Sequence, residues 1–509
     1  MSLGIGLDTL QYAKAINKTV QEVLHLLNKT REGPVMAPNA PAVPEWLLHA
    51  LLYAYTGLLA LALLLAVHYV YYTRRAANPS PPPSRAAPSH DKLVIIVPVK
   101  GESVSTIVES VRRLAALECP NSEVLIVSDD PPEKFEETKK AVGALGLSNV
   151  KTLRRPNPAG YKGTALNWAV ERASGQVLAF LDVDDLPPPD LCARARSVGE
   201  NEIAFLGWSG YAPIKTPLAK LLLFLYKYLL YYTAIVGRYS AGHPILALGS
   251  GIAIKKEFFK RLGGFCNCTA DDYDISIKAY LNGGRVAYLP GTPVYVEVPA
   301  GYNAFKRQYA RWTYNSAYLL ARYAVSILRQ LKVSPAHRLS ILMNVATHPL
   351  MVITAAASVA IGMIFGYLGM LLPPLHILAL QLALFVVTMV HILRIYSIAR
   401  RDGVGLRLVF SNFAKSGALL LTLCPYLTLY TILGLLGRRI KWRVTPKGAS
   451  ALEGGAWGPY EIVLIAALAA ILAAAIYVGN FTLMASAAVP LAAVLYTLAF
   501  IAAQRVTTS

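Results

Sequence analysis

The sequence has 509 residues, of which 55% are hydrophobic and 15% are charged, and its formal net charge at pH 7 is +20. A soluble domain of average composition carries about 25% charged residues, so this chain is poor in charge. The composition excludes an intrinsically disordered chain and a simple soluble enzyme. The five cysteines are few and unevenly spaced, so we expect structural or incidental thiols rather than a disulfide framework or a zinc site.

The N-terminal part predicts a membrane anchor. Residues 1–45 contain apolar side chains at helical spacing, which indicates an amphipathic helix. Residues 46–72 are apolar for longer than the roughly 20 residues that a bilayer requires, and we expect one transmembrane helix there. Arg74 and Arg75 follow directly, so the positive-inside rule places the N-terminus outside and the next segment in the cytoplasm. Residues 73–92 are rich in proline and serine and form a linker.

Residues 93–340 have the pattern of a cytosolic α/β domain. Short apolar strands are expected at 93–99, 123–128, 151–155 and 177–182, with helices between them at 103–117, 132–145 and 163–173. This alternation predicts a parallel sheet, which binds ligands at the carboxyl ends of its strands. Five aspartates lie at those ends: Asp129, Asp130, Asp182, Asp184 and Asp185.

Two segments of this domain are expected to be interfacial helices, at 217–236 and 305–330. The first contains two lysines and many aromatic residues, which is typical of a helix in the headgroup plane. Acidic motifs flank it on both sides, and a membrane span there would separate them.

Apolar segments resume after residue 340. We expect two transmembrane helices within 341–396 and two more within 460–503. The run 409–436 is interrupted by a lysine and a proline, and counting it as a span would place the basic loop 437–459 outside, against the positive-inside rule. We therefore interpret it as an interfacial or re-entrant helix, which leaves five spans and a cytoplasmic C-terminus.

The acidic motifs suggest chemistry at the sheet edge. Asp182 and Asp184 leave a buried strand as alternate residues, an arrangement that suits a hard divalent cation and a diphosphate. The alternatives are a solvated acidic turn, a helix cap or a hydrolytic carboxylate pair. A second cluster, Asp271, Asp272 and Asp274, opens a helical pattern, where acidic residues are also common for reasons of helix stability.

Taken together, the motifs resemble those of the membrane-embedded inverting glycosyltransferases of family 2, cellulose-synthase-like branch. The resemblance covers roughly residues 90–450 and rests on these motifs: Asp129-Asp130, Lys162 in Gly-Tyr-Lys-Gly, Asp182-x-Asp184, Ala270-Asp271-Asp272, Gln308-x-x-Arg311-Trp312 and Val444-Thr445-x-Lys447-Gly448. Ala270-Asp271 stands where the family usually has Thr-Glu, so the supporting acid is one methylene shorter.

The resemblance implies a GT-A fold, a Rossmann-like nucleotide-diphospho-sugar transferase domain, joined to a multi-span helical membrane domain. It implies Asp272 as the catalytic base, and Asp184 with Asp182 as ligands of Mg²⁺ or Mn²⁺. The implied donor-binding residues are Asp129, Asp130, Lys162, Asp182, Arg311 and Lys447. The implied acceptor-binding residues are Trp312, Gln308 and Asp271, and Gly249 with Ser250 is either a close backbone approach to the acceptor or a tight turn.

The expected function is transfer of one hexose, with GDP-mannose as the leading donor, to a polyprenol-linked saccharide, because the chain resembles archaeal mannosyltransferases of lipid-linked glycan assembly. A processive polysaccharide synthase using UDP-glucose or UDP-N-acetylglucosamine is an alternative, although five spans offer few channel walls. A nucleotide-binding transporter or flippase is another. We expect a plasma-membrane protein with a cytoplasmic catalytic domain that contacts membrane lipid, with no nucleic-acid partner and no obligate protein partner evident.

Overall fold

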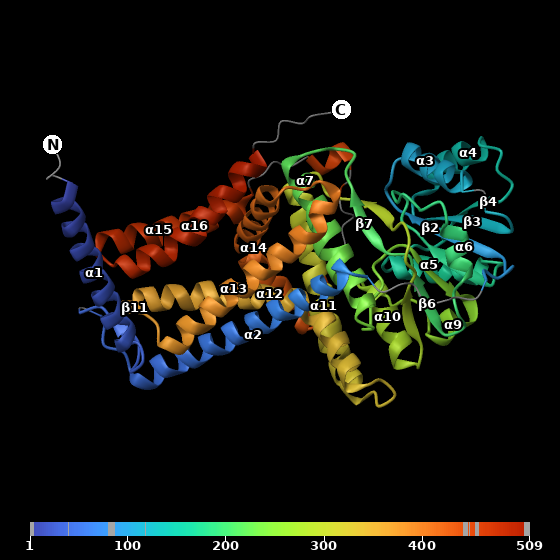
Figure 1. Cartoon of the computed structure of the whole chain (residues 1–509). Helices are drawn as coiled ribbons and strands as arrows, with labels where there is room; N and C mark the ends of the chain where they lie inside the picture. Colours follow the sequence, from blue (N-terminus) through green and yellow to red (C-terminus); the bar gives the residue numbers. More distant parts are fainter. Residues whose placement is uncertain are drawn as a thin grey trace.

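The computed structural model describes residues 5–38, 40–79, 87–117, 119–440, 446, 448–452 and 458–502. Figure 1 shows an α/β domain at one end of the molecule and a set of long helices that runs away from it. The two parts share one hydrophobic core, because a single cluster of buried side chains extends from Ile96 in the sheet through Tyr302 to Leu423 in the helices. The sheet and the helices therefore form one packed body.

A seven-stranded sheet with the strand order β4-β3-β2-β5-β8-β6-β9 forms the centre of the α/β domain. Its strands are β2 (Leu93–Val99), β3 (Ser122–Ser128), β4 (Val150–Arg154), β5 (Val177–Phe180), β6 (Glu202–Phe205), β8 (Ile252–Lys255) and β9 (Arg285–Tyr288). The four strands expected from the sequence are present, and they pair in parallel with one another. The Rossmann-like half of the fold is thus confirmed.

The expectation of a wholly parallel sheet is wrong for β8, which runs antiparallel to both β5 and β6. The chain leaves β6 at the edge where the parallel strands end, and it enters β8 at that same edge. Gly251 marks the entry: its N–H donates to the carbonyl of Phe180 at 3.0 Å, and its carbonyl accepts from Leu206. Its φ of +69° is one that glycine adopts readily.

Side chains of β2 alternate between two cores, as expected for a strand covered on both faces. Leu93 and Ile95 pack with α3 (Val104–Ala115), α4 (Pro132–Gly143) and α6 (Leu191–Arg196) on one face. The opposite face carries the remaining helices of the domain: α5 (Lys162–Arg172), α9 (Lys256–Arg261) and α10 (Asp271–Leu281). That second face is the one continuous with the long helices.

The remaining elements are the other helices and four short strands. The helices are α1 (Ile5–Lys29), α2 (Glu45–Ala77), α7 (Pro217–Phe224), the π-helix η1 (Leu225–Gly237), α8 (Arg238–Ser240), α11 (Tyr302–Arg329), α12 (Pro335–Tyr367), α13 (Leu375–Ala399), η2 (Arg400–Asp402), α14 (Leu406–Leu435), η3 (Gly448–Leu452), α15 (Pro459–Tyr477) and α16 (Phe481–Ala502). β7 (Trp208–Tyr211) pairs in parallel with β10 (Val294–Glu297), and β1 (Val35–Met36) pairs antiparallel with β11 (Met370–Leu372).

Within the described residues, seven helices are long and apolar enough to cross a membrane: Glu45–Ala77, Pro217–Ser240, Pro335–Tyr367, Leu375–Asp402, Leu406–Leu435, Pro459–Tyr477 and Phe481–Ala502. Five of them coincide with the expected spans. The other two are the expected interfacial helices near 217–236 and 409–436, whose placement at the interface stays a prediction. The third expected interfacial helix is part of α11, which is outside this set of seven.

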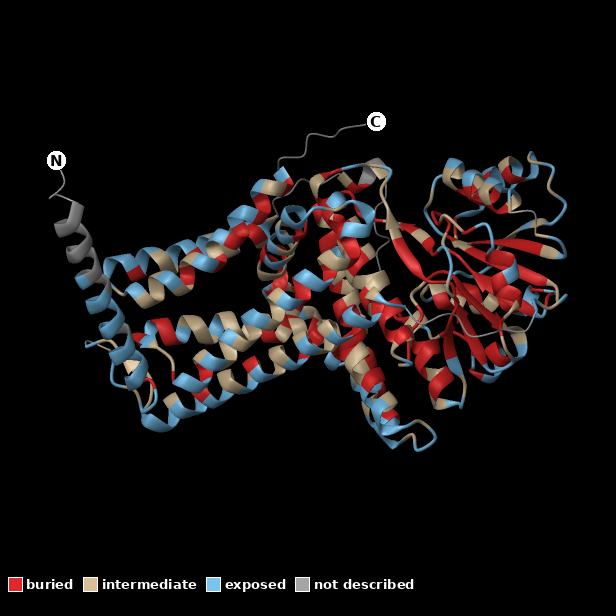
Figure 2. Cartoon of the chain, viewed as in Figure 1, coloured by how far each residue is buried: buried red, intermediate tan, exposed pale blue. Residues whose placement is uncertain are grey.

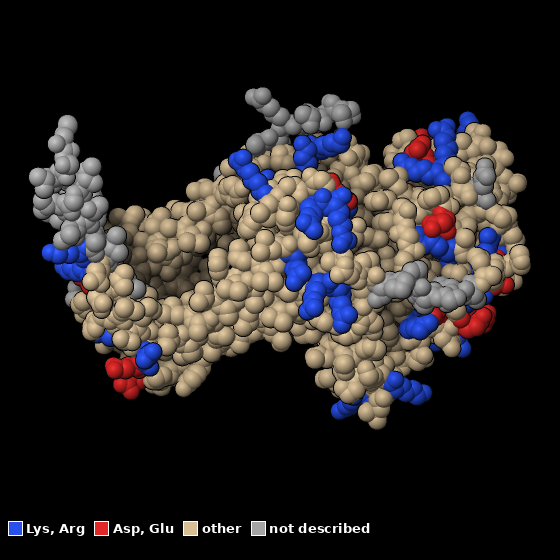
Figure 3. Space-filling view, viewed as in Figure 1, with Lys and Arg blue, Asp and Glu red and all other residues tan. Residues whose placement is uncertain are grey.

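The surface of the long helices is that of a membrane protein. Figure 2 shows the sheet strands buried, whereas the long helices present many exposed residues, and these include large apolar side chains such as Leu64, Leu382 and Phe385. Figure 3 shows few charges on that part of the molecule and several lysine and arginine side chains where the helices meet the α/β domain. An apolar surface of this extent fits contact with lipid, and the basic band fits its headgroups.

The expectation of incidental thiols is wrong for four of the five cysteines. Cys119 is bonded to Cys192 with a Cα–Cα distance of 6.0 Å, and Cys266 is bonded to Cys268 with 5.3 Å, while Cys424 is free and buried. The first pair is separated by 73 residues in the chain. Folding of the sheet brings its two members together, which spacing alone does not reveal.

Candidate active site

The aspartates after β5 form a turn at the carboxyl edge of the sheet. The side chain of Asp182 is 37% exposed, whereas Asp184 and Asp185 are buried. Asp185 holds the turn together, because its Oδ2 accepts hydrogen bonds from the N–H of Asp182 at 2.6 Å and from the hydroxyl of Ser250. Asp182 therefore has the only one of these three side chains that is partly exposed, at the edge where such sheets usually bind ligands.

Lys162, the first residue of α5, joins this turn to the loop before β8. Its Nζ donates to Oδ1 of Asp182 at 2.5 Å and to the carbonyl oxygen of Gly249 at 3.0 Å. Burial lowers the pKa of Lys162, but the negative charges of Asp182, Asp271 and Asp185 raise it by more. The pKa therefore lies above its ordinary value. The ammonium is therefore a fixed positive charge in an acidic cluster.

Asp129 and Asp130 follow β3 and are both engaged by protein groups. Arg155 donates from Nε to Oδ1 of Asp129 at 2.7 Å and from Nη2 to Oδ2, which is a bidentate pair between two buried side chains. Oδ1 of Asp130 accepts from the N–H of Gly101 at 2.7 Å. Arg155 carries no motif in the sequence, and the prediction of this site missed it.

Glu102 is a second residue that the sequence does not reveal. Its Oε2 accepts from the N–H of Lys100 at 2.5 Å. Burial raises the pKa of Glu102, the backbone N–H groups lower it, and the nearby Asp130 and Asp182 raise it again, with a net increase. Glu102 therefore faces the acidic edge from the loop after β2.

Asp271 and Asp272 are the first residues of α10. Gly163 lies close to Asp271, and Gly249 lies beside Asp272. A β-carbon on Gly163 would stand 3.3 Å from Cβ of Asp271 and 2.5 Å from the carbonyl oxygen of Cys266, so only glycine allows α5 to lie this close. A β-carbon on Gly249 would stand 3.5 Å from Oδ2 of Asp272. Gly249 therefore lies next to both Lys162 and Asp272.

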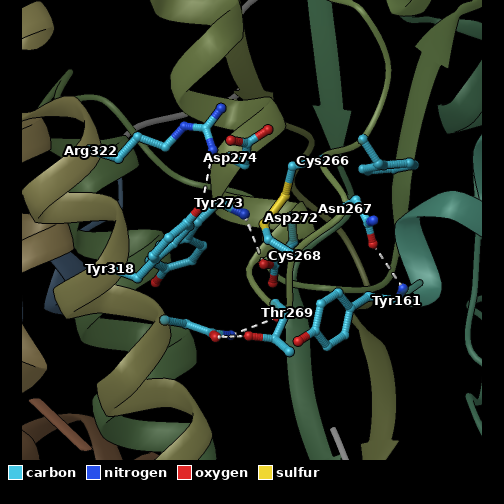
Figure 4. Close-up of a disulfide and its surroundings, with 12 residues drawn as sticks. Tyr161, Cys266, Asn267, Cys268, Thr269, Asp272, Tyr273, Asp274, Tyr318 and Arg322 are labelled. Atoms are coloured by element: carbon cyan, nitrogen blue, oxygen red, sulfur yellow. Dashed lines mark hydrogen bonds between the residues drawn. A yellow bond between two sulfur atoms is a disulfide. The ribbon is translucent and has the colours of Figure 1, made fainter. Parts of the chain in front are cut away.

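The loop before α10 is held by the Cys266–Cys268 disulfide, which Figure 4 shows beside Asp272 and Tyr273. Asn267 accepts a hydrogen bond from the N–H of Tyr161, the residue before Lys162, at 3.1 Å. Thr269 pairs with Asn315 of α11 through two hydrogen bonds, one of them 2.7 Å from Asn315 Nδ2 to the Thr269 carbonyl. The disulfide loop thus ties together the three helices that carry the site.

The carboxyl of Asp272 has a raised pKa. Burial raises the pKa of its carboxyl most, the charge of Asp271 raises it further, and the N–H of Tyr273 and the charge of Lys162 lower it, giving about 7. The N–H of Tyr273 donates to Oδ1 at 2.8 Å, so Oδ2 is the oxygen that faces Gly249. A carboxylate poised near neutral pH accepts a proton effectively.

Arg311 and its neighbours lie on α11. Burial lowers the pKa of Arg311, while Asp182, Asp272 and Asp271 raise it, with a net decrease, so its guanidinium faces the same carboxylates as Lys162. Oε1 of Gln308 accepts from the hydroxyl of Tyr226 at 2.9 Å, which commits that oxygen to the protein. Trp312 is half-buried, with ring centroids 6.1 Å from Trp208 and 5.9 Å from Tyr226.

Lys447 and Thr445 of the predicted gating-type loop lie outside the described residues. On either side of them the chain contacts the site region. The hydroxyl of Tyr161 donates to the carbonyl of Ile440 at 2.9 Å, and the N–H of Gly448 donates to Oε1 of Glu297 at 2.6 Å. The role expected for Lys447 stays a prediction.

The structure thus brings Asp182, Lys162, Gly249, Ser250, Asp271, Asp272 and Arg311 to one edge of the sheet. A Rossmann-like mixed sheet with clustered carboxylates and two cations at this edge, beside membrane-type helices, defines a glycosyltransferase of GT-A fold. A model of the family described as glycosyl transferase family group 2 matches residues 177–501, and one described as glycosyl transferase family 2 matches residues 94–245. The chain therefore belongs to glycosyl transferase family group 2.

The chain is also similar to individual proteins. A probable glycosyltransferase of Sulfolobus acidocaldarius is 26% identical over 371 residues, which cover 70% of this chain and 77% of the relative. A probable glucomannan 4-beta-mannosyltransferase of Arabidopsis thaliana is 24% identical over 195 residues, 36% of this chain and 44% of the relative. A solved mannosyltransferase from Pyrobaculum calidifontis, in complex with GDP-Man and Mn²⁺, is 20% identical with a TM-score of 0.48, covering 75% of this chain and all of that one.

Proposed function

We propose that the protein is an inverting, metal-dependent glycosyltransferase that moves one hexose from a nucleoside-diphosphate sugar to a polyprenol-linked saccharide, in N-glycan or related lipid-linked glycan assembly. The observation that carries the proposal is the position of Asp272, a carboxyl with a pKa of about 7 next to Gly249, across from Lys162 and Asp182. One potential base thus faces a separate, cation-rich site for a diphosphate.

The donor is expected at the sheet edge, with its diphosphate near Lys162 and Arg311. These two cations would stabilise the negative charge that develops as the nucleoside diphosphate leaves. Asp129 or Asp130 would contact the base or ribose. Because Asp129 already pairs with Arg155, Arg155 fixes the carboxylate for that contact. The name of the Arabidopsis relative supports mannose as the sugar, and GDP-mannose is our leading donor.

Asp182 and Asp184 fit a divalent cation such as Mg²⁺ or Mn²⁺. Their donor set is carboxylate oxygen only, which hard cations prefer, and the exposed side chain of Asp182 is accessible from the donor side. When bound, such an ion supplies Lewis-acid stabilisation of the diphosphate. The neighbouring phenol of Tyr211 donates to the backbone carbonyl of Asp184 at 2.7 Å and keeps that part of the turn in place.

Asp272 would take the proton from the acceptor hydroxyl while the oxygen of that hydroxyl attacks the anomeric carbon. The bond to the leaving diphosphate breaks as the new glycosidic bond forms, so a single displacement inverts the configuration at that carbon. Trp312, Asp271 and the Gly249–Ser250 backbone would line the acceptor side, with Gln308 positioned behind them by Tyr226.

The catalytic domain would face the cytoplasm at the plasma membrane, with the N-terminus outside and the C-terminus inside. The basic band at the junction of helices and sheet supports this orientation. A lipid-linked acceptor fits a site whose carrier elements, α10 and α11, share a core with the apolar helices.

Donor choice and metal dependence are tested by isothermal calorimetry of the purified protein with GDP-mannose, UDP-glucose and UDP-N-acetylglucosamine, each with and without Mn²⁺. We expect Mn²⁺-dependent binding of GDP-mannose, and its loss in Asp184→Ala. Equal affinity of Asp184→Ala with Mn²⁺ would overturn the metal assignment. Preferential binding of a UDP-sugar would overturn the choice of donor and favour the processive-synthase alternative.

A further inference from the structure

Arg238 is a buried arginine at a place that the donor site does not use. It is the first residue of α8, directly after η1, and only 3% of it is exposed. Its Nη1 donates to Oγ of Ser340 at 2.9 Å, and its Nη2 lies 3.0 Å from Nε2 of His68. The guanidinium also stacks over the ring of Tyr72, at 4.5 Å from the ring centroid.

No carboxylate pairs with Arg238 among the residues that the structure describes. The ionisable groups around it are the phenols of Tyr69, Tyr72, Tyr273 and Tyr280, together with the imidazoles of His68 and His243. Burial of a charge is costly unless a counter-charge compensates it, and arginine inside proteins is usually paired for that reason. The guanidinium is hydrogen-bonded to Ser340 and lies against His68, but these partners are neutral, so an anion from outside the chain would balance its charge.

Two histidines that are less buried than Arg238 belong to the same cluster. Nδ1 of His243 lies 2.7 Å from the hydroxyl of Tyr72, and the ring of His337 is 6.0 Å from that of His243. Both rings are half-buried. Burial lowers the pKa of His243, and so do His337, Arg238 and Arg75, which shows that the local potential is positive. The cluster thus combines a buried guanidinium with two partly exposed imidazole rings.

The position of this cluster relates it to both membrane and catalytic site. The cluster joins the C-terminal part of α2 to the start of α12, and the last turn of α2 carries the basic residues Arg74 and Arg75. On its inner side lies the phenol of Tyr273, whose pKa is raised by burial and by Asp272 and lowered by Arg238. Tyr273 therefore lies within electrostatic range of both the potential base and the buried arginine.

We infer that Arg238, His243 and His337 form a binding site for the phosphate of a phosphorylated isoprenoid lipid, separate from the donor diphosphate site at Lys162 and Arg311. The identity of the lipid as the acceptor rests on the proposed function. An anion held here would lie within electrostatic range of Tyr273, the neighbour of Asp272, which suits an acceptor whose saccharide reaches the base while its hydrocarbon chain stays in lipid.

The test is equilibrium binding of radiolabelled C55 polyprenyl monophosphate to the full-length protein in detergent. The double variant His243→Gln/His337→Gln removes the outer donors without emptying the core, and Arg238→Gln removes the buried charge. Loss of charge-assisted hydrogen bonds predicts at least about a tenfold rise in Kd for the double variant. His49→Gln, an exposed residue at the opposite end of α2, is the matched control and should bind as the wild type.

Three competitors separate the sources of the anion. Polyprenyl monophosphate should displace the label, whereas unphosphorylated polyprenol, phosphatidylglycerol and millimolar inorganic phosphate should not. Equal displacement by polyprenol would show that the phosphate is not recognised. Equal displacement by phosphatidylglycerol or inorganic phosphate would show a general anion site, and either result would overturn the inference.

The proposed function fails separately from this inference. A protein that binds the lipid phosphate in a histidine-dependent manner but transfers no sugar contradicts only the proposed function. If the double variant retains its thermal unfolding temperature, transfers sugar and keeps the wild-type KM for the lipid-linked acceptor, the phosphate site is wrong. In the predicted outcome this KM rises about tenfold while GDP-mannose binding is unchanged.

Discussion

The ammonium of Lys162 lies 2.5 Å from Oδ1 of Asp182, and the same nitrogen donates to the carbonyl of Gly249. These contacts join the turn after β5, which contains Asp182, to the Gly249 loop beside Asp272. Removal of the amine would therefore affect two parts of the site at once: the charge available to a leaving diphosphate and the orientation of the Asp182 carboxylate.

We expect Lys162→Met to lower kcat by about 10²- to 10³-fold, the loss seen when one preorganised group that stabilises developing charge is removed. The measurement is steady-state transfer in detergent with saturating donor and Mn²⁺. Lys140→Met, at an exposed position of α4 away from the site, is the control and should retain full activity. Activity of Lys162→Met within a factor of two of wild type would be incompatible with a role at the diphosphate.

The pKa of Asp272 predicts the pH dependence of the reaction. The carboxylate is the active form of a base, and its pKa is raised to about 7 by burial and by Asp271. Turnover should fall roughly tenfold per pH unit below about pH 7 and reach a plateau above it. In Asp271→Asn one raising charge is gone, so the midpoint should move to lower pH. A profile without an acid limb between pH 5 and 7 would exclude Asp272 as the titrating base.

Removal of the Cys266–Cys268 disulfide is expected to lower turnover. Its loop contacts the residue before Lys162 and also α11, so opening it should misplace α10 relative to both. We expect Cys266→Ser/Cys268→Ser to lower kcat by about 10- to 100-fold, because small displacements of reacting groups are costly, with little change in GDP binding. The control is Cys119→Ser/Cys192→Ser, which removes the other disulfide. Equal kcat losses in the two variants would indicate general destabilisation instead.

Gly237 predicts a stability effect at the contact between α2 and η1. A β-carbon there would stand 2.3 Å from the carbonyl oxygen of Tyr72, so Gly237→Ala must separate the two helices. We expect a loss of about 1–3 kcal/mol in the free energy of unfolding, typical of overpacking. Gly417→Ala in α14 is the matched control, since nothing lies within 4 Å of its added carbon. Thermal unfolding in detergent compares them, and equal midpoints would disprove the close contact.

The sequence predicted the parts of the fold that follow from local patterns. The apolar strands 123–128 and 177–182 and the aspartates at their ends were recognisable because strand ends in a parallel sheet converge on one edge. Arg155 was missed because its pairing with Asp129 depends on how β3 and β4 align, which no local pattern encodes. The direction of β8 was missed because it depends on the return of the chain from η1 to the sheet edge.

The candidate site shows the same division. Asp182, Lys162 and Asp272 were named from their motifs, whereas Gly163 and Gly249 gained their meaning from close approaches that only the three-dimensional structure contains. Glu102 and Arg238 carry no motif at all. Their significance lies in burial and in neighbours that come from distant parts of the chain.

The most direct test of the account is product analysis after transfer from GDP-mannose to a lipid-linked disaccharide in the presence of Mn²⁺, with wild-type protein and Asp272→Asn. Mass spectrometry should show one added hexose for the wild type, and NMR should show that an α-linked donor gives a β-linked product. Asp272→Asn should give no product while binding GDP-mannose normally. A ladder of added hexoses, a product with retained α configuration, or near-normal transfer by Asp272→Asn would contradict the account.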